Sequence, residues 1–118
     1  MRTVLGCCEV TPEERAAVTR ARDEAERLAT VFKALSDETR VRIVQRLLQA
    51  SQPLCECHVV ELFELSQPTI NYHLRVLRGA GVVEAERRGA WTYYWVSPKS
   101  VLGVVRSLAA LSRRDQDR

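Results

Sequence analysis

The sequence predicts a mainly helical α+β fold in which a small β-hairpin accompanies several short helices. Apolar residues recur every three or four positions through most of the chain, and after Gly81 the period changes to about two. A chain of 118 residues with 46% hydrophobic residues supports one domain with a modest core. We therefore expect a flexible arm at 1–10, one folded domain at 11–111 and a polar tail at 112–118.

The first predicted helix begins at Thr11. Thr11, Pro12 and Glu14 stand at the N-cap, first and third helical positions, which is the pattern of a capping box. An apolar stripe then runs to residue 35, and its members are Val18, Ala21, Ala25, Leu28, Phe32 and Leu35. The stripe can pack on its own domain or on a second subunit.

Ser36 and Asp37 interrupt the stripe and cap a second predicted helix over 38–50. Its expected core residues are Val41, Ile43, Val44, Leu47 and Leu48. A third predicted helix covers 57–65, with Val59, Val60, Leu62 and Phe63 facing inward. Because almost no linker separates this helix from the next one, the two form a predicted helix-turn-helix.

Ser66 caps the fourth predicted helix, which ends near Ala80. With about 100° of rotation per residue, Ile70, Leu74 and Leu77 share one narrow face of this helix. The opposite side and its flanks carry Gln67, Asn71, Tyr72, Arg75 and Arg78. No Asp or Glu occurs between residues 66 and 80, and amide, hydroxyl and guanidinium groups suit phosphate oxygens and base edges. The alternative is an ordinary solvated helix face.

Alternating residues on either side of Gly89 predict a β-hairpin. Val83 and Ala85 precede the turn, and Trp91, Tyr93 and Trp95 follow it. Beside a helix-turn-helix such a hairpin is a wing, so the predicted fold is a winged helix-turn-helix. Arg87 and Arg88 at its tip would then reach the sugar–phosphate backbone or the minor groove, unless the tip is simply solvated.

Ser97 and Pro98 begin the last predicted helix. Its apolar residues are Val101, Leu102, Val104, Val105, Leu108 and Leu111. They cover more of the helix than one small domain can bury, which indicates a second subunit. A homodimer formed through the first and last helices would set two reading helices about 34 Å apart, which fits an inverted repeat in double-stranded DNA.

The net charge of +3 favours an anionic partner. No run of eighteen apolar residues and no apolar leader segment occur, so we expect no membrane association and a cytoplasmic location. In that reducing compartment, cysteines are ligands or sensors more often than disulfides. No Cys-x-x-Cys, βαβ pattern or phosphate-binding loop accompanies the cysteines, so we do not expect an enzyme.

Four cysteines are candidate ligands for a thiophilic ion, because thiolates are soft ligands. Cys55 and Cys57 stand at the start of the third predicted helix, where positions i and i+2 point about 200° apart. Both sulfurs can bind one ion only if the helix frays at Cys55. Further thiolates must come from Cys7 and Cys8 on the arm. A structural zinc site of four cysteines is the alternative, although it requires rigid loops.

Two runs, FKALSDETRVRIVQRLL at 32–48 and LCECHVVELFELSQPTINYHLRVLRGAGVV at 54–83, closely resemble the ArsR/SmtB family of metal-responsive winged-helix repressors. The resemblance covers about residues 28–111. It implies a homodimer that holds operator DNA when free of metal and releases it when metal binds, with no organic cofactor. The residues that match the family's reading helix and wing are Gln67, Thr69, Asn71, Tyr72, Arg75, Arg87 and Arg88.

The sequence departs from the family pattern in two places, one on the reading helix and one just before it. Asn71 and Tyr72 stand where Ser and His are frequent, and Glu64 stands where Gly is frequent. The departure at Asn71 and Tyr72 leaves the operator sequence open, but DNA binding is still expected.

The resemblance also suggests what the cysteines bind. In the family a Cys-x-Cys at this place is similar to the soft-metal site of arsenic, antimony, cadmium or lead sensors, and the arm of one subunit can complete the site on the other. As(III) takes three sulfurs, whereas Cd(II) or Pb(II) could use all four. The adjacent Cys7 and Cys8 favour As(III) or Sb(III) as the inducer, with Cd(II) or Pb(II) as alternatives. A thiol redox switch without a metal is a further alternative.

Both histidines are expected to have structural roles. His58 would be a surface or capping residue, or a minor ligand, and His73 would be hydrogen bonded at the edge of the core. The zinc site that some family members form across the last helices needs His and carboxylate ligands. The last helix has no His, and Asp115 and Asp117 lie in the tail, so we expect this site to be absent.

Overall fold

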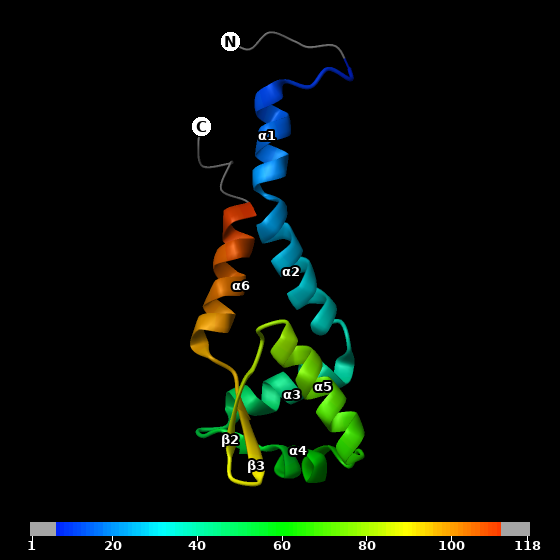
Figure 1. Ribbon diagram of the computed structural model, residues 1–118, viewed down its shortest axis with the longest axis vertical. Helices are drawn as coiled ribbons and strands as arrows, with labels where there is room; N and C mark the ends of the chain where they lie inside the picture. The colour runs from blue at the N-terminus through cyan, green and yellow to red at the C-terminus, as the bar shows by residue number, and fades with distance from the viewer. Residues whose placement is uncertain (1–6, 112–118) are drawn as a thin grey trace.

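Helices and a small antiparallel sheet make up the computed structural model, which describes residues 7–111. Two long helical segments, α1 with α2 and then α6, extend from one side of a compact body that holds the other elements (Figure 1). The longest dimension is 64 Å and the other two are 25 and 24 Å. The predicted fold class is confirmed, while the first six residues of the predicted arm and the whole predicted tail, with Asp115 and Asp117, lie outside the described residues.

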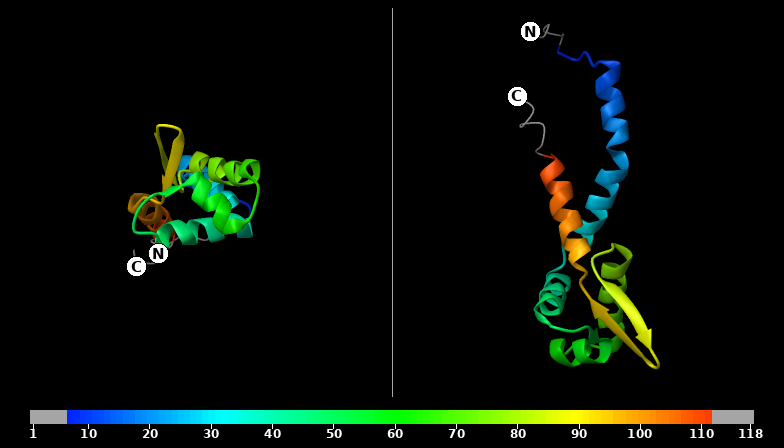
Figure 2. Two further views of the ribbon diagram at one scale, coloured as in Figure 1. Left: turned by 90° about the horizontal axis from the view of Figure 1, so that it is seen from below. Right: turned by 90° about the vertical axis from the view of Figure 1, so that its left-hand side faces the viewer.

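The single helix predicted from Thr11 to Leu35 is wrong, because the structure divides it into α1 (Pro12–Arg20) and α2 (Arg22–Ala34). The capping box at Thr11 is confirmed: Thr11 N–H donates to Glu14 Oε2 at 2.8 Å, and Glu14 N–H donates to Thr11 Oγ1 at 3.1 Å. Near the break, Thr19 Oγ1 donates to the Arg15 carbonyl at 3.2 Å, a bond of the type that bends helices. The two segments meet at an angle in Figure 2.

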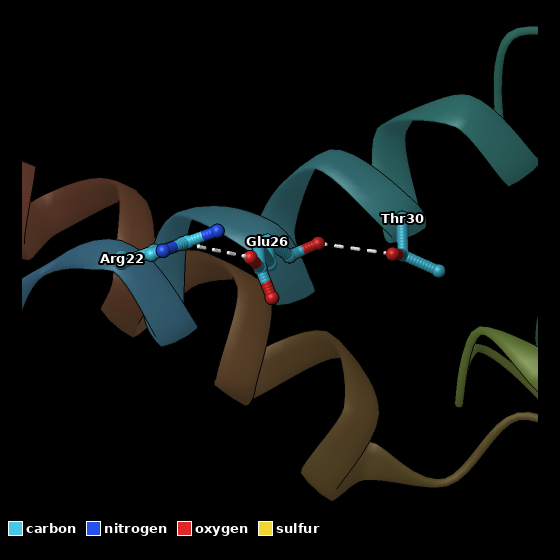
Figure 3. A network of polar contacts seen from close by, with 3 residues as sticks. All are labelled: Arg22, Glu26 and Thr30. Atoms are coloured by element: carbon cyan, nitrogen blue, oxygen red, sulfur yellow. Dashed lines mark hydrogen bonds and ion pairs between the residues drawn. The ribbon is translucent and has the colours of Figure 1, made fainter.

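Most of α1 and α2 is exposed. Leu28 and Ala34 are buried on α2, whereas 76% of Val18 and 45% of Phe32 is exposed. The polar side of α2 carries an ion pair between Arg22 and Glu26 at 3.3 Å and a bond from Thr30 Oγ1 to the Glu26 carbonyl at 2.9 Å (Figure 3). Of the predicted apolar stripe, Leu28 is buried and Leu35 packs on the core, while Val18, Ala21, Ala25 and Phe32 are exposed.

The core lies where α3 (Glu38–Gln49), α4 (Glu56–Phe63) and α5 (Gln67–Gly79) meet the sheet and the C-terminal end of α2. Asp37 caps α3 by accepting from the Arg40 N–H at 3.1 Å, as predicted. The buried cluster is formed by Ala34, Ile43, Leu47, Val59, Ile70, Leu74, Leu77, Val82, Val83 and Tyr94. Val41, Leu48 and Leu62 were predicted to be core residues but are 39 to 54% exposed, because α3 and α4 each bury only one narrow face.

Three strands form the sheet in the order β1-β3-β2. The predicted hairpin is confirmed as β2 (Glu84–Arg88) and β3 (Trp91–Trp95). Its two-residue turn has Gly89 at φ +64°, with a positive φ at the first central position only, as in a type II′ turn. The sequence analysis did not predict β1 (Leu54–Cys55), which pairs Cys55 with Tyr93. Two residues are too few to produce an alternating pattern.

The last helix, α6 (Pro98–Leu111), begins as predicted, with Ser97 Oγ accepting from the Lys99 N–H at 3.1 Å. It lies alongside α2 at the narrow end of the molecule (Figure 2). Val101, Leu102, Val105 and Leu108 are between 41 and 55% exposed. Among the helices of residues 7–111, none combines the length and apolar character that a membrane span requires.

Glu64 ends α4 in the left-handed conformation, with φ +53° and ψ +37°. This is the position at which the sequence departs from the family's usual Gly. A residue with a Cβ pays roughly 1–2 kcal/mol for this conformation, whereas glycine adopts it freely.

We expect Glu64→Gly to raise the free energy of unfolding by about 1 kcal/mol, because it removes this backbone strain. Urea denaturation followed by circular dichroism measures the effect. Glu61→Gly, in the interior of the same helix, is the matched control and should lower the free energy of unfolding by about 1 kcal/mol. Equal losses in both variants would contradict the argument.

Candidate nucleic-acid interface and cysteine site

The helix predicted to read DNA is fixed to the core by one face. Ile70, Leu74 and Leu77 of α5 are fully buried, which confirms the predicted core side. Ser66 caps the helix: its Oγ accepts from the Thr69 N–H at 3.3 Å and donates to Thr69 Oγ1 at 2.8 Å. The other side of α5 presents Tyr72, which is 60% exposed, and the exposed side chains of Arg75 and Arg78.

A buried carboxylate, which the sequence analysis missed, lies beside α5. Glu56 is the first residue of α4 and is only 8% exposed. Its carboxylate accepts from Gln67 Nε2, from Asn71 Nδ2 at 3.3 and 3.4 Å, and from the Tyr94 hydroxyl at 3.3 Å. A charge at this depth is tolerated because several donors surround it and because the N-terminus of a helix favours a negative group.

This network corrects part of the predicted reading face. Asn71 was expected to point away from the core, but it is half-buried and its amide is bound to Glu56. The amide of Gln67 is bound to the same carboxylate. Helical periodicity predicts only which face of α5 meets the core. It does not predict that the start of α4 covers the side of α5 that carries Gln67 and Asn71.

Tyr94 connects the carboxylate to the sheet. Burial raises the pKa of the Tyr94 hydroxyl, and the charge and hydrogen bond of Glu56 raise it further, while the more distant charges of Arg78 and Arg75 oppose the shift. The neutral hydroxyl is therefore the form that the folded state favours.

The wing carries the two predicted arginines at its tip. Arg87 Nε donates to the Gly89 carbonyl at 3.1 Å, which stabilises the turn. Arg88 forms an ion pair with Glu86 at 2.8 Å, and its guanidinium lies 4.8 Å from the centre of the Tyr93 ring. Because both arginines remain exposed, their charges are available to an anionic partner.

Cys55 and Cys57 lie side by side. Cys55 belongs to β1 and is the N-cap of α4, with an extended backbone at φ −66° and ψ 142°, so it stands outside the helix. Its sulfur lies 2.9 Å from the Cys57 sulfur. The sequence analysis required a non-helical Cys55 for both sulfurs to bind one ion, and the structure meets that condition.

The Cys57 thiol is exposed and hydrogen bonded to its neighbour. The Cys55 thiol raises the pKa of Cys57 above its ordinary value, mainly through this hydrogen bond. Cys57 therefore keeps its proton to a higher pH than a free cysteine does, and an ion that binds both sulfurs must displace that proton.

Cys7 and Cys8 are not near this pair. Both are exposed, and α1 carries the described part of the arm to the end of the molecule opposite α4 (Figure 1). Within residues 7–111, no group of three or more His, Cys, Asp or Glu side chains lies close enough to hold a metal ion. One chain alone thus brings together two of the four predicted ligands.

The two histidines have the structural roles that the sequence predicts. His58 is exposed, as expected for a surface residue. His73 is half-buried, and its Nδ1 lies 3.2 Å from Arg40 Nη1, while Arg40 Nε donates to the Ala34 carbonyl at 2.6 Å. This agrees with the predicted hydrogen-bonded packing role of His73.

Comparison with known proteins supports this geometry. Residues 37–85 match the family model described as bacterial regulatory protein, arsR family. The arsenical resistance operon repressor of Bacillus subtilis is 36% identical over 74 residues, which cover 63% of this chain and 70% of that protein. The chain belongs to the ArsR family. It is therefore a transcriptional repressor of the winged helix-turn-helix class and not an enzyme.

Two further ArsR-family comparisons extend beyond the helix-turn-helix. A homologue of the cadmium resistance regulatory protein CadC from Staphylococcus aureus is 36% identical over 103 residues, which cover 83% of this chain and 84% of that protein. The solution structure of a homodimeric winged helix-turn-helix domain from Mycobacterium bovis, a possible ArsR-family regulator, aligns with a TM-score of 0.64 and 26% identity. That alignment covers 77% of this chain and 84% of the other.

We expect Tyr94→Phe to lower the free energy of unfolding by about 1 kcal/mol near neutral pH, because Glu56 loses a donor. The raised pKa of Tyr94 means that the folded state holds this proton more tightly than the unfolded state. Wild-type stability should then fall as the pH rises above about 10, the ordinary pKa of tyrosine. The difference between the two proteins should therefore shrink at high pH.

Urea denaturation at several pH values between neutral and about 11 measures this difference. Tyr72→Phe, which changes an exposed tyrosine on α5, is the matched control and should leave the pH profile unchanged. A constant difference between wild type and Tyr94→Phe across this range would show that the hydroxyl is not coupled to the carboxylate.

Proposed function

We propose that this ArsR-family repressor binds an inverted-repeat operator as a homodimer when it is free of metal, and releases it when As(III) or Sb(III) binds to cysteine thiolates. The observation that carries the proposal is the adjacent pair of sulfurs, Cys55 and Cys57, at the entrance to the helix-turn-helix. The arsenical resistance repressor of B. subtilis is among its relatives.

The charges of α5 and the wing support the DNA-binding part of the proposal. Between Ser66 and Ala80 the helix carries no acidic residue, and Arg75 and Arg78 are exposed on its outer side. Arg87 and Arg88 extend the positive surface at the tip of the wing. Thr69 and Tyr72 would supply uncharged contacts, and Gln67 and Asn71, whose amide nitrogens bind Glu56, would contribute through their amide oxygens. Such a surface places cations against phosphates and polar side chains against base edges.

The exposed apolar residues of α2 and α6 support the homodimer. Phe32, Leu102 and Val105 are between 45 and 55% exposed on helices that extend beyond the core. Burying apolar area stabilises association by about 25 cal/mol per Å² before the costs of ordering. The homodimeric M. bovis domain aligns over most of this chain. A twofold axis through these helices would set the two α5 helices about one duplex turn apart.

The placement of the cysteines indicates a site shared between subunits. As(III) needs three thiolates, and one chain provides two at α4. Since residues 7–10, the described part of the arm, lie at the opposite end of the molecule from α4, we expect Cys7 and Cys8 of the partner subunit to complete the site. Each site would then contain sulfurs from both chains, and no organic cofactor takes part.

Two alternatives have specific support. The cadmium-resistance homologue aligns over 83% of this chain, against 63% for the B. subtilis arsenical repressor, which favours Cd(II), or similarly Pb(II), bound by all four sulfurs. The short distance between the Cys55 and Cys57 sulfurs favours a thiol redox switch. Release by peroxide in the presence of a chelator would identify that mechanism.

We expect the double variant Cys55→Ser, Cys57→Ser to retain operator binding and to lose release by As(III), because the two central thiolates are absent. An operator duplex selected by wild-type protein from a random pool provides the probe, and fluorescence anisotropy measures release against As(III), Sb(III), Cd(II), Pb(II) and Zn(II). His58→Ala, which changes an exposed neighbour of Cys57, should release normally. Normal release by the double variant would place the site elsewhere.

We expect Arg75→Ala to weaken operator binding by at least about tenfold and to reduce the salt dependence of the affinity, since a phosphate or base contact is lost. Anisotropy titrations at several salt concentrations test this. Arg22→Ala removes the same charge from the N-terminal part of α2, away from α5, and serves as the control (Figure 3). An equal loss in both variants would indicate a general charge effect.

A further inference from the structure

Glu56 occupies a position that no functional role described above explains. It is the single residue between Cys55 and Cys57, and its carboxylate is buried against α5. Two of its three hydrogen-bond partners, Gln67 and Asn71, belong to α5, and both match the family's DNA-reading positions. The same short peptide therefore carries the sulfur pair outward and a carboxylate inward.

We propose that Glu56 is the positioning residue that transmits ion binding at the cysteine pair to the reading helix; this inference rests on the proposed function. The carboxylate holds the amides of Gln67 and Asn71 in place at the N-terminal half of α5. It acts through these two side chains and does not itself contact DNA or the ion.

The backbone around Glu56 explains why the link can move. Cys55 lies in the extended backbone of β1, and Cys57 lies in the first turn of α4, so Glu56 stands at the junction between strand and helix. The two sulfurs are joined only by a hydrogen bond between thiols. An ion that binds both of them would impose a separation of its own. Because each peptide unit is planar, the backbone can adjust the separation of the two cysteines only through the φ and ψ angles of the residues around Glu56.

Small displacements are sufficient to weaken this network. The bonds from Asn71 and from the Tyr94 hydroxyl are already 3.3 to 3.4 Å long, near the limit of effective hydrogen bonding. A buried carboxylate that loses donors is strongly destabilised, so the surrounding groups must rearrange. The groups free to do so are the Gln67 and Asn71 side chains at the start of α5, so their amides take new orientations while the helix stays packed on the core.

The third partner of Glu56, Tyr94, belongs to the sheet and not to α5. Tyr94 binds the same carboxylate but belongs to β3, whose register with β1 and β2 is fixed by backbone pairing. The partners that can pass a change to α5 are Gln67 and Asn71, because they belong to that helix.

The test measures a ratio, the operator dissociation constant with saturating As(III) divided by the constant without it. Couplings of this type are about 5- to 150-fold in regulated proteins. Glu56→Gln keeps the size of the side chain but turns one acceptor oxygen into a donor that faces other donors. We expect its ratio to fall below about threefold, while calorimetric titration shows that As(III) still binds the thiols.

Control variants separate transmission from stability. Glu61→Gln makes the same chemical change at an exposed position of α4 and should keep the wild-type ratio. Should Glu56→Gln fail to fold in a circular dichroism melt, Asn71→Ser removes a donor from α5 and should lower the ratio in the same direction.

An unchanged ratio in Glu56→Gln, or in Asn71→Ser where that variant replaces it, overturns the inference and leaves Glu56 as a structural clamp. A wild-type protein that As(III) does not release from its operator contradicts the proposed function itself, so the two failures are distinguishable. By reciprocity, the operator should also weaken As(III) binding less in Glu56→Gln than in wild type.

Discussion

The burial of one face of α5 is the constraint on which the rest of the structure depends. Ile70, Leu74 and Leu77 are fully buried, so the helix can neither rotate nor slide without exposing a large apolar area. This fixes the direction of every other side chain on α5. The polar and basic residues must then face outward or toward the start of α4, and the proposed reading surface is a consequence of core packing.

The second constraint is electrostatic. A carboxylate buried at the junction of β1 and α4 needs donors, and the side chains of α5 and β3 provide them. The sheet, the cysteine pair and the reading helix thereby meet at one group. In a small domain such a meeting point connects local chemistry with the placement of side chains on a neighbouring element.

Local sequence signals predicted much of this fold and part of the site. The caps at Thr11, Asp37 and Ser66, the buried stripe of α5 and the hairpin around Gly89 all depend on residues a few positions apart, so they are visible in sequence. The contact between Glu56 and Asn71 joins two different helices, α4 and α5. The periodicity of either helix alone does not predict such a contact. An acidic residue between two cysteines was the available signal. The break at Ala21 escaped prediction because the apolar spacing continues through it.

The separation of the arm from the cysteine pair has a consequence for how such a repressor responds to its own abundance. If two sulfurs of each site come from a second chain, a monomer lacks a complete binding site. Ion binding is then coupled to dimerisation, so the apparent affinity for the ion falls as the protein is diluted. Sensitivity to the ion would thus depend on the concentration of the sensor itself, so that a dilute sensor detects the ion only at higher exposure.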